Sequence, residues 1–196
     1  MSITDHNPRE TPGPETGRVP GDVHMWVMVL GDLFFFGCYF ITYMVFRARS
    51  VDEFASAQRH LHMGVGVANT IVLLASSLFV ALAVAAVRTN SAGLAQRYLA
   101  AAGVCGVVFT LLEIYEWQQE IGNGRTVSQP FFGFYYVFTG IHLAHLFLGL
   151  LILGIVAREL RVSRSPRVGL AEQGAVYWHM VDLLWIVIFA ILYLMR

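Results

Sequence analysis

The chain has 196 residues, of which 57% are hydrophobic and only 13% are charged. A water-soluble domain of this size needs more polar surface, so the composition favours a membrane protein. Thirteen acidic residues balance thirteen basic residues, which leaves no overall positive field to attract nucleic acid. Partners are therefore expected within the membrane.

Residues 1–20 contain four of the six prolines and no apolar core, so they are predicted to form a disordered tail rather than a signal peptide. Residues 21–196 are predicted to form one transmembrane domain. About 20 helical residues cross the hydrocarbon core of a bilayer. Five apolar runs meet this length, and the spans are predicted near 23–46, 64–87, 94–120, 131–157 and 174–195. The predicted fold class is thus all-α, a polytopic bundle of five transmembrane helices.

The arginines predict the orientation of this bundle, because positive residues near span ends are retained on the cytoplasmic side. Eight arginines fall in the tail, the second loop and the fourth loop, against five on the opposite side. The N-terminus is therefore expected in the cytoplasm and the C-terminus outside the cell membrane.

The first span carries Asp32 near mid-depth, where an acidic residue costs about 2.5 to 3.5 kcal/mol on the insertion scale. The many Val, Leu, Ile and Phe residues of the span offset this cost, so the helix can still insert. Two hypotheses explain the residue. Asp32 has a functional role, which is the default for an ionisable group in a membrane, or it is a protonated acid that bonds a neighbouring helix.

The third and fourth spans carry ionisable residues at helical spacing. Glu113, Glu116 and Glu120 are three and four residues apart and share one face. Glu120 is expected at the membrane interface and solvated, whereas the two deeper glutamates should face the interior and find donors there. His142 and His145 share a face of the fourth span, and a glutamate-to-histidine pairing across these antiparallel neighbours is within reach.

The last span, "VYWHMVDLLWIVIFAILYL", places Trp178, Asp182 and Trp185 on one stripe with His179 beside it. Two ionisable groups between aromatic rings indicate a face that packs against protein. The cysteines, Cys38 and Cys105, lie on different apolar runs and indicate neither a disulfide framework nor a metal cluster.

Three classes of protein would carry ionisable residues of this kind in their spans. A b-type haem protein needs axial histidines from opposed helices, whereas the two histidines of the fourth span share one face. A small proton-coupled transporter would also place Asp, Glu and His in its spans, but five helices give no even inverted repeat. A structural subunit of a larger respiratory complex needs only buried polar groups that hold helices, lipids or waters, and the residues favour this third hypothesis.

Four motifs occur in order on four of the five spans: "NTIVLLASS" (69–77), "YEW" (115–117), "FYYVFTGIHLAH" (134–145) and "EQGAVYWHMVDLLW" (172–185). They closely resemble subunit III of the haem-copper oxidases, the cytochrome c oxidase subunit III family, from about residue 21 to 196. The resemblance implies the shorter, five-helix bacterial form. It also implies an accessory subunit of an oxidoreductase complex that is not itself catalytic. Such a subunit binds no haem or metal and flanks a catalytic subunit I that carries haem with copper or iron. The family role is to support proton uptake and to protect the catalytic subunit during turnover, with phospholipid held in a cleft.

Helical spacing and the resemblance together give the candidate site residues. Those expected to be proton-related or buried and polar are Asp32, Glu113, Glu116, His142, His145, His179 and Asp182; the family-motif residues that are candidates for lipid or partner contact are Glu172, Tyr177, Trp178 and Trp185.

One position departs from the family pattern. Most oxidase members carry a Ser-Glu pair where this chain has Gly31 and Asp32 in "GDLFFFG". This sequence is similar instead to that of the NorE branch, whose members are associated with nitric oxide reductase. The resemblance therefore leaves open whether the partner reduces oxygen or nitric oxide.

Overall fold

The computed structural model describes residues 23–162 and 167–195, so the predicted tail at 1–20 lies outside the described residues. Within those ranges every regular element is helical, and the elements in chain order are α1 (Val23–Arg49), α2 (Val51–Gln58), α3 (Met63–Arg88), α4 (Ala92–Gly122), α5 (Pro130–Val162), α6 (Val168–Phe189) and the π-helix η1 (Ala190–Leu194). Five of these helices are long and apolar enough to cross a membrane. The predicted all-α, five-span fold is confirmed.

Two details differ from the predicted spans. The loop after α1 contains the short helix α2, which begins with Asp52 and Glu53 in its first turn, where acidic side chains favour the positive end of the helix dipole. The last span begins at Val168 rather than near residue 174. Ala171 and Gly174 in its first turns are buried, so packing against the bundle stabilises helical residues that precede the apolar run.

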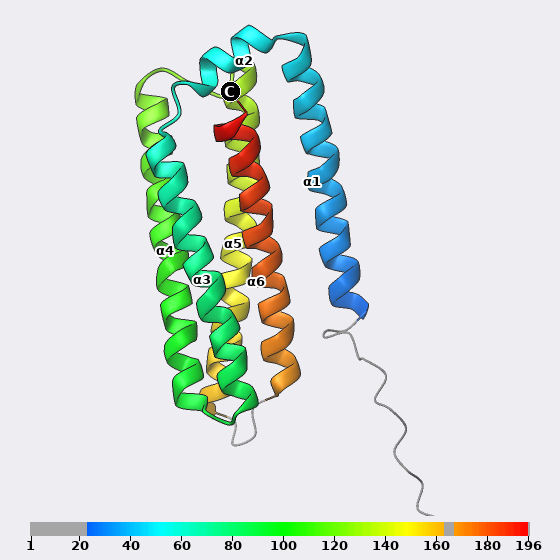
Figure 1. Ribbon diagram of the computed structural model, residues 1–196, viewed down its shortest axis with the longest axis vertical. Coiled ribbons are helices and arrows are strands. Elements are labelled where there is room, and N and C mark those ends of the chain that lie inside the picture. Colours follow the sequence, from blue (N-terminus) through cyan, green and yellow to red (C-terminus); the bar gives the residue numbers. More distant parts are fainter. Residues whose placement is uncertain (1–22, 163–166, 196) are drawn as a thin grey trace, which may run out of the picture.

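Helices α3, α4, α5 and α6 run side by side as a bundle, and α1 lies along one edge of it (Figure 1). The α3–α4 connection is the tightest. Asn90 adopts φ 54°, a left-handed conformation that asparagine tolerates better than most residues, and this reverses the chain within three residues. The two helices consequently pack as antiparallel neighbours along most of their length.

Helix α1 is attached to the bundle mainly through aromatic side chains in its C-terminal half. The ring of Phe138 on α5 lies 4.7 Å from Tyr39, 5.0 Å from Phe40 and 5.9 Å from Tyr43, measured between ring centroids. Tyr43 and Phe138 are completely buried, whereas Phe34, further toward the N-terminus, is 75% exposed. The helix is thus held most strongly through its C-terminal half, and it presents apolar side chains such as Phe34 outward.

The C-terminal end of α6 is closed by polar side chains from α1 and α2. The π-helix leaves backbone carbonyls without helical donors, as any helix C-terminus does. The buried amide of Gln58 donates to the carbonyls of Ile191 (3.0 Å) and Leu192 (3.2 Å), and Arg47 donates to that of Met195 (2.7 Å). The helix end therefore avoids the cost of unpaired carbonyls in an apolar environment.

Trp178 fills the centre of the bundle. A Cβ added at Gly149 on α5 would lie 2.9 Å from its ring, and one added at Gly106 on α4 would lie 3.2 Å from it. The indole N–H donates to the Ser76 hydroxyl on α3 (3.1 Å), which in turn donates to the carbonyl of Ala102 on α4 (3.1 Å). One side chain thus contacts three other helices, and two glycines provide the room for it.

Candidate functional site

Asp32 is joined to the bundle through His145 of α5. The Asp32 Oδ1 atom lies 3.6 Å from His145 Nε2, and the two side chains are 28% and 21% exposed. His145 Nδ1 lies 2.8 Å from the Ile141 carbonyl, which can only accept a hydrogen bond, so Nδ1 carries a proton. Nε2 is the ring atom that faces the Asp32 carboxyl group, at a distance slightly longer than a hydrogen bond.

A second cluster contains the three glutamates of α4, all completely buried. Asn69 of α3 donates to Glu113 (3.1 Å), and Tyr193 of η1 donates to Glu116 (2.7 Å). The other carboxyl oxygen of each has no partner among the described residues. The cluster therefore has capacity for additional hydrogen bonds inside the bundle.

Glu120 corrects the sequence prediction. It was expected to be solvated at the interface, but it is completely buried and accepts a hydrogen bond from Arg125, with Nη1 2.6 Å from Oε2. Arg125 follows in the α4–α5 loop and folds back over the end of α4, so the ion pair replaces water as the partner of the carboxylate. The spacing placed Glu120 on the right face but did not show that the loop covers it.

The two histidines of α5, His142 and His145, lie in different environments. His142 is completely buried between the rings of Phe109 and Trp185, at centroid distances of 5.4 and 5.2 Å. Neither of its ring nitrogens has a hydrogen-bond partner in the described part of the chain. The glutamate-to-histidine pairing that the antiparallel helices would allow is therefore not formed, because Glu113 bonds Asn69 and His145 turns toward α1.

A third polar group lies between α3 and α6. The Ser77 hydroxyl is 2.8 Å from His179 Nδ1, and that nitrogen is 4.0 Å from Asp182 Oδ2. The His179 side chain is 41% exposed, whereas that of Asp182 is 6% exposed. Asp182 Oδ1 and Oδ2 accept no hydrogen bond from any described residue.

The motif residues named as candidates for lipid or partner contact are mostly interior. Trp178 and Trp185 are 0% exposed and Tyr177 is 1% exposed, so in this structure they contact the chain's own helices. Trp185 donates to Thr70 of α3 (3.1 Å). Glu172 is the accessible member of the group, and it pairs with Arg88 through two nitrogens at 3.0 and 2.7 Å.

Several residues that complete these groups were not predicted as site residues. Asn69 and Ser77 lie within the motif "NTIVLLASS", and Gln58, Arg125 and Tyr193 lie outside the four motifs. Asn69 could have been found, because a buried amide in a transmembrane run needs a partner, as a carboxylate does. Within the described ranges, no group of three or more His, Cys, Asp or Glu side chains could hold a metal ion.

The structure defines a class of protein: a five-span membrane bundle with carboxyl and imidazole side chains buried among its own helices. The chain belongs to the cytochrome c oxidase subunit III family, whose model matches residues 21–196. A curated relative from Synechocystis sp., named cytochrome c oxidase subunit 3, is 30% identical over 202 residues, covering 98% of this chain and 84% of the relative. The similarly named protein of Thermostichus vulcanus is 28% identical over 175 residues (86% and 84%). A probable cytochrome c oxidase subunit 3 of Mycobacterium leprae is 31% identical over 175 residues (87% and 85%).

Proposed function

We propose that the chain is the non-catalytic subunit III of a haem-copper terminal oxidase, bound to the catalytic subunit I in a bacterial cell membrane. In this role it stabilises the catalytic subunit, holds phospholipid and supports proton uptake. The family match over residues 21–196 is the observation that carries the proposal. The haem, copper or iron belongs to the partner, and this chain supplies helix surface and buried polar side chains. We propose the orientation that the arginines favour, with the N-terminus in the cytoplasm.

The buried polar side chains suit a supporting role. The carboxyls of α4 are covered by Asn69, Tyr193 and Arg125 of the same chain. Asp32 and His145 are different, because both side chains are partly exposed on the α1 side of the bundle. We propose that this pair is where the chain can hold or pass a proton at the surface of a partner.

A second candidate partner is nitric oxide reductase. Asp32 has a shorter side chain than the glutamate usual in oxidase members, and in the structure it still reaches His145. The "GDLFFFG" sequence, which favours the NorE branch, is therefore compatible with the same supporting role. The two candidates give this chain the same role and differ in the catalytic partner and its electron acceptor.

The partner can be identified by purifying the tagged chain from its membranes in mild detergent. We expect a catalytic subunit to co-purify, with copper and an a-type or o-type haem visible in the reduced-minus-oxidised spectrum. A partner with b-type haem and non-haem iron would identify the reductase instead. Recovery of the chain without any haem-containing partner, under conditions that keep other respiratory complexes intact, would contradict the proposal.

A further inference from the structure

Five buried polar atoms in the part of the bundle near the α4–α5 loop have no hydrogen-bond partner among the described residues. They belong to residues that are all completely buried: Asn69 Oδ1, Glu113 Oε1, Glu116 Oε1, Glu120 Oε1 and the Tyr135 hydroxyl. The great majority of buried polar groups in proteins are hydrogen-bonded. Five such atoms in one region therefore indicate a further binding partner.

These atoms come from three helices but lie close to one another. Asn69 Nδ2 of α3 is 3.1 Å from Glu113 Oε2 of α4. Glu113, Glu116 and Glu120 follow one another on one face of α4 over about 10 Å along the helix. Tyr135 of α5 is near enough to interact electrostatically with all three carboxyl groups. The five atoms therefore share one region inside the bundle.

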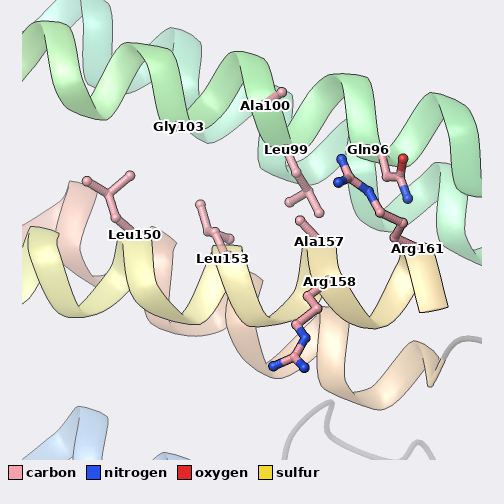
Figure 2. Close-up of a pocket in the computed structure, with 10 residues that line it drawn as sticks. Gln96, Leu99, Ala100, Gly103, Leu150, Leu153, Ala157, Arg158 and Arg161 are labelled. Carbon is pink, nitrogen blue, oxygen red and sulfur yellow. The ribbon is translucent and has the colours of Figure 1, made fainter. Parts of the chain in front are cut away.

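The opposite end of the same two helices has a different character. There, a groove of roughly 400 Å³ between α4 and α5 is lined mostly by small and aliphatic side chains such as Leu99 and Leu153 (Figure 2). Its lining also includes Arg158 and Arg161 but no carboxyl group. The buried carboxyl groups of α4 are thus confined to the half of the bundle next to the α4–α5 loop.

Four of the five unpartnered atoms are acceptors. An amide oxygen and an ionised carboxyl oxygen can only accept hydrogen bonds, whereas the Tyr135 hydroxyl can also donate one. None of the five atoms bonds to another of them. A ligand that satisfies them must therefore donate hydrogen bonds and must bridge groups that do not reach each other.

Water is the ligand that this arrangement fits. A buried water molecule typically makes about three hydrogen bonds to polar groups that otherwise lack partners, and it both donates and accepts. Leaving the same atoms unpaired in an apolar interior costs free energy. A metal ion fits less well, because no group of three or more His, Cys, Asp or Glu in the described part of the chain could hold one.

Arg125 closes this region toward the solvent. Its side chain is 22% exposed, and Nη1 lies 2.6 Å from Oε2 of the buried Glu120. Arg125 also lines a pocket of roughly 370 Å³ together with Glu53, His60 and Gln129. Most side chains around this pocket are polar, so water reaches Arg125 from it. The ion pair of Arg125 and Glu120 thus separates a hydrated pocket from the buried carboxyl groups.

We infer that this region is a binding site for internal water, which bridges Asn69, Tyr135 and the carboxyl groups of α4 and exchanges with the solvent past Arg125. Through this water the buried carboxyl groups exchange protons with the solution at the α4–α5 loop. The site is built from residues of this chain alone. It is separate from Asp32 and His145 and does not depend on which catalytic subunit the chain joins.

The test uses the full-length chain in mild detergent, equilibrated in ¹⁸O-labelled water, diluted rapidly into ordinary water and irradiated with X-rays after a set delay. Hydroxyl radicals formed from water that is still bound oxidise the side chains beside it, and mass spectrometry locates the ¹⁸O. We expect ¹⁸O on Tyr135 and only background on Phe138, which is also completely buried but is packed among aromatic rings. The loss of ¹⁸O with increasing delay measures the exchange of the water.

Replacing Asn69 and Glu113 together tests the site. Removing both members of a hydrogen-bonded pair avoids leaving one buried polar group alone. Asn69→Leu combined with Glu113→Leu should lower the ¹⁸O on Tyr135 to the background of Phe138. Ser77→Ala removes a polar side chain of α3 that contacts His179, outside this region, and should leave the labelling unchanged.

Arg125→Gln tests the path of exchange. The variant loses the charge-assisted hydrogen bond that closes the region, so the bound ¹⁸O should be lost on the order of tenfold faster than in the parent chain. Arg59→Gln removes an exposed arginine that does not line the pocket and should exchange at the rate of the parent.

Background labelling of Tyr135 in the parent chain would overturn the inference, because protonated carboxyl groups would then supply the hydrogen-bond donors. Equal labelling of Tyr135 and Phe138 would overturn it as well, since water would then reach the whole interior. Unchanged labelling in the leucine double variant, with its helical content confirmed by circular dichroism, would contradict the site. An unchanged exchange rate in Arg125→Gln would contradict the path past Arg125. If the double variant does not fold, the parent chain and Arg125→Gln still decide.

Discussion

Replacing Trp178 with alanine is expected to lower the free energy of unfolding by about 3 to 5 kcal/mol, the range for removing a buried tryptophan. The side chain is completely buried and fits between Gly106 and Gly149, which cannot fill the cavity themselves. The change also removes the indole donor to Ser76, which bonds α4. Thermal unfolding of the purified chain in mild detergent measures the loss.

Two further variants on α6 show whether the loss of stability comes from the buried ring of Trp178. Trp178→Phe keeps an aromatic ring but removes the N–H group, so its stability should lie between the parent and the alanine variant. Leu183→Ala removes a side chain that is 51% exposed and should change the unfolding temperature little. If Trp178→Ala and Leu183→Ala unfolded at the same temperature, Trp178 would not be the central packing residue.

Replacing Phe138 with alanine is expected to loosen α1 from the bundle, at a cost of about 3 to 5 kcal/mol. Phe138 is completely buried and contacts three aromatic residues of α1, whereas Phe134, which also contacts α1, is only partly buried. Hydrogen exchange in detergent should show faster exchange in α1 while α3 and α4 stay protected. Phe147, 56% exposed on the same helix, provides the control substitution to alanine.

Uniform loss of protection across all five spans in Phe138→Ala would show that α1 is an integral part of the bundle rather than an attached helix. That result would also weaken the role proposed for Asp32 and His145, which assumes that the α1 side of the bundle is a distinct surface.

Hydropathy and span length were sufficient to predict the five helices, because a bilayer imposes one minimum length on every span. They could not predict α2, which lies outside the apolar runs and depends on Gln58 reaching the carbonyls of η1. The beginning of α6 at Val168, rather than near residue 174, was not predicted for a similar reason. Its first turns are buried by tertiary packing, which periodicity along one helix does not show.

The candidate site was predicted less completely than the fold. Spacing showed that Glu113 and Glu116 share a face, but their partners Asn69 and Tyr193 are 44 and 77 positions away in the sequence. Which helices are neighbours in space decides such pairs, and short loops indicate only consecutive neighbours. The pairing of Asp32 with His145 joins the first and fourth spans, so no loop length could have indicated it.

The most direct test of the supporting role is to strip this chain from its complex with detergent and to count turnovers before inactivation. We predict that the stripped catalytic partner keeps its haem and an initial rate near that of the complete complex, but inactivates after several-fold fewer turnovers. Adding the purified chain back with phospholipid should restore the original number. Loss of haem and of all activity on stripping, or an unchanged number of turnovers, would contradict a non-catalytic subunit that protects its partner.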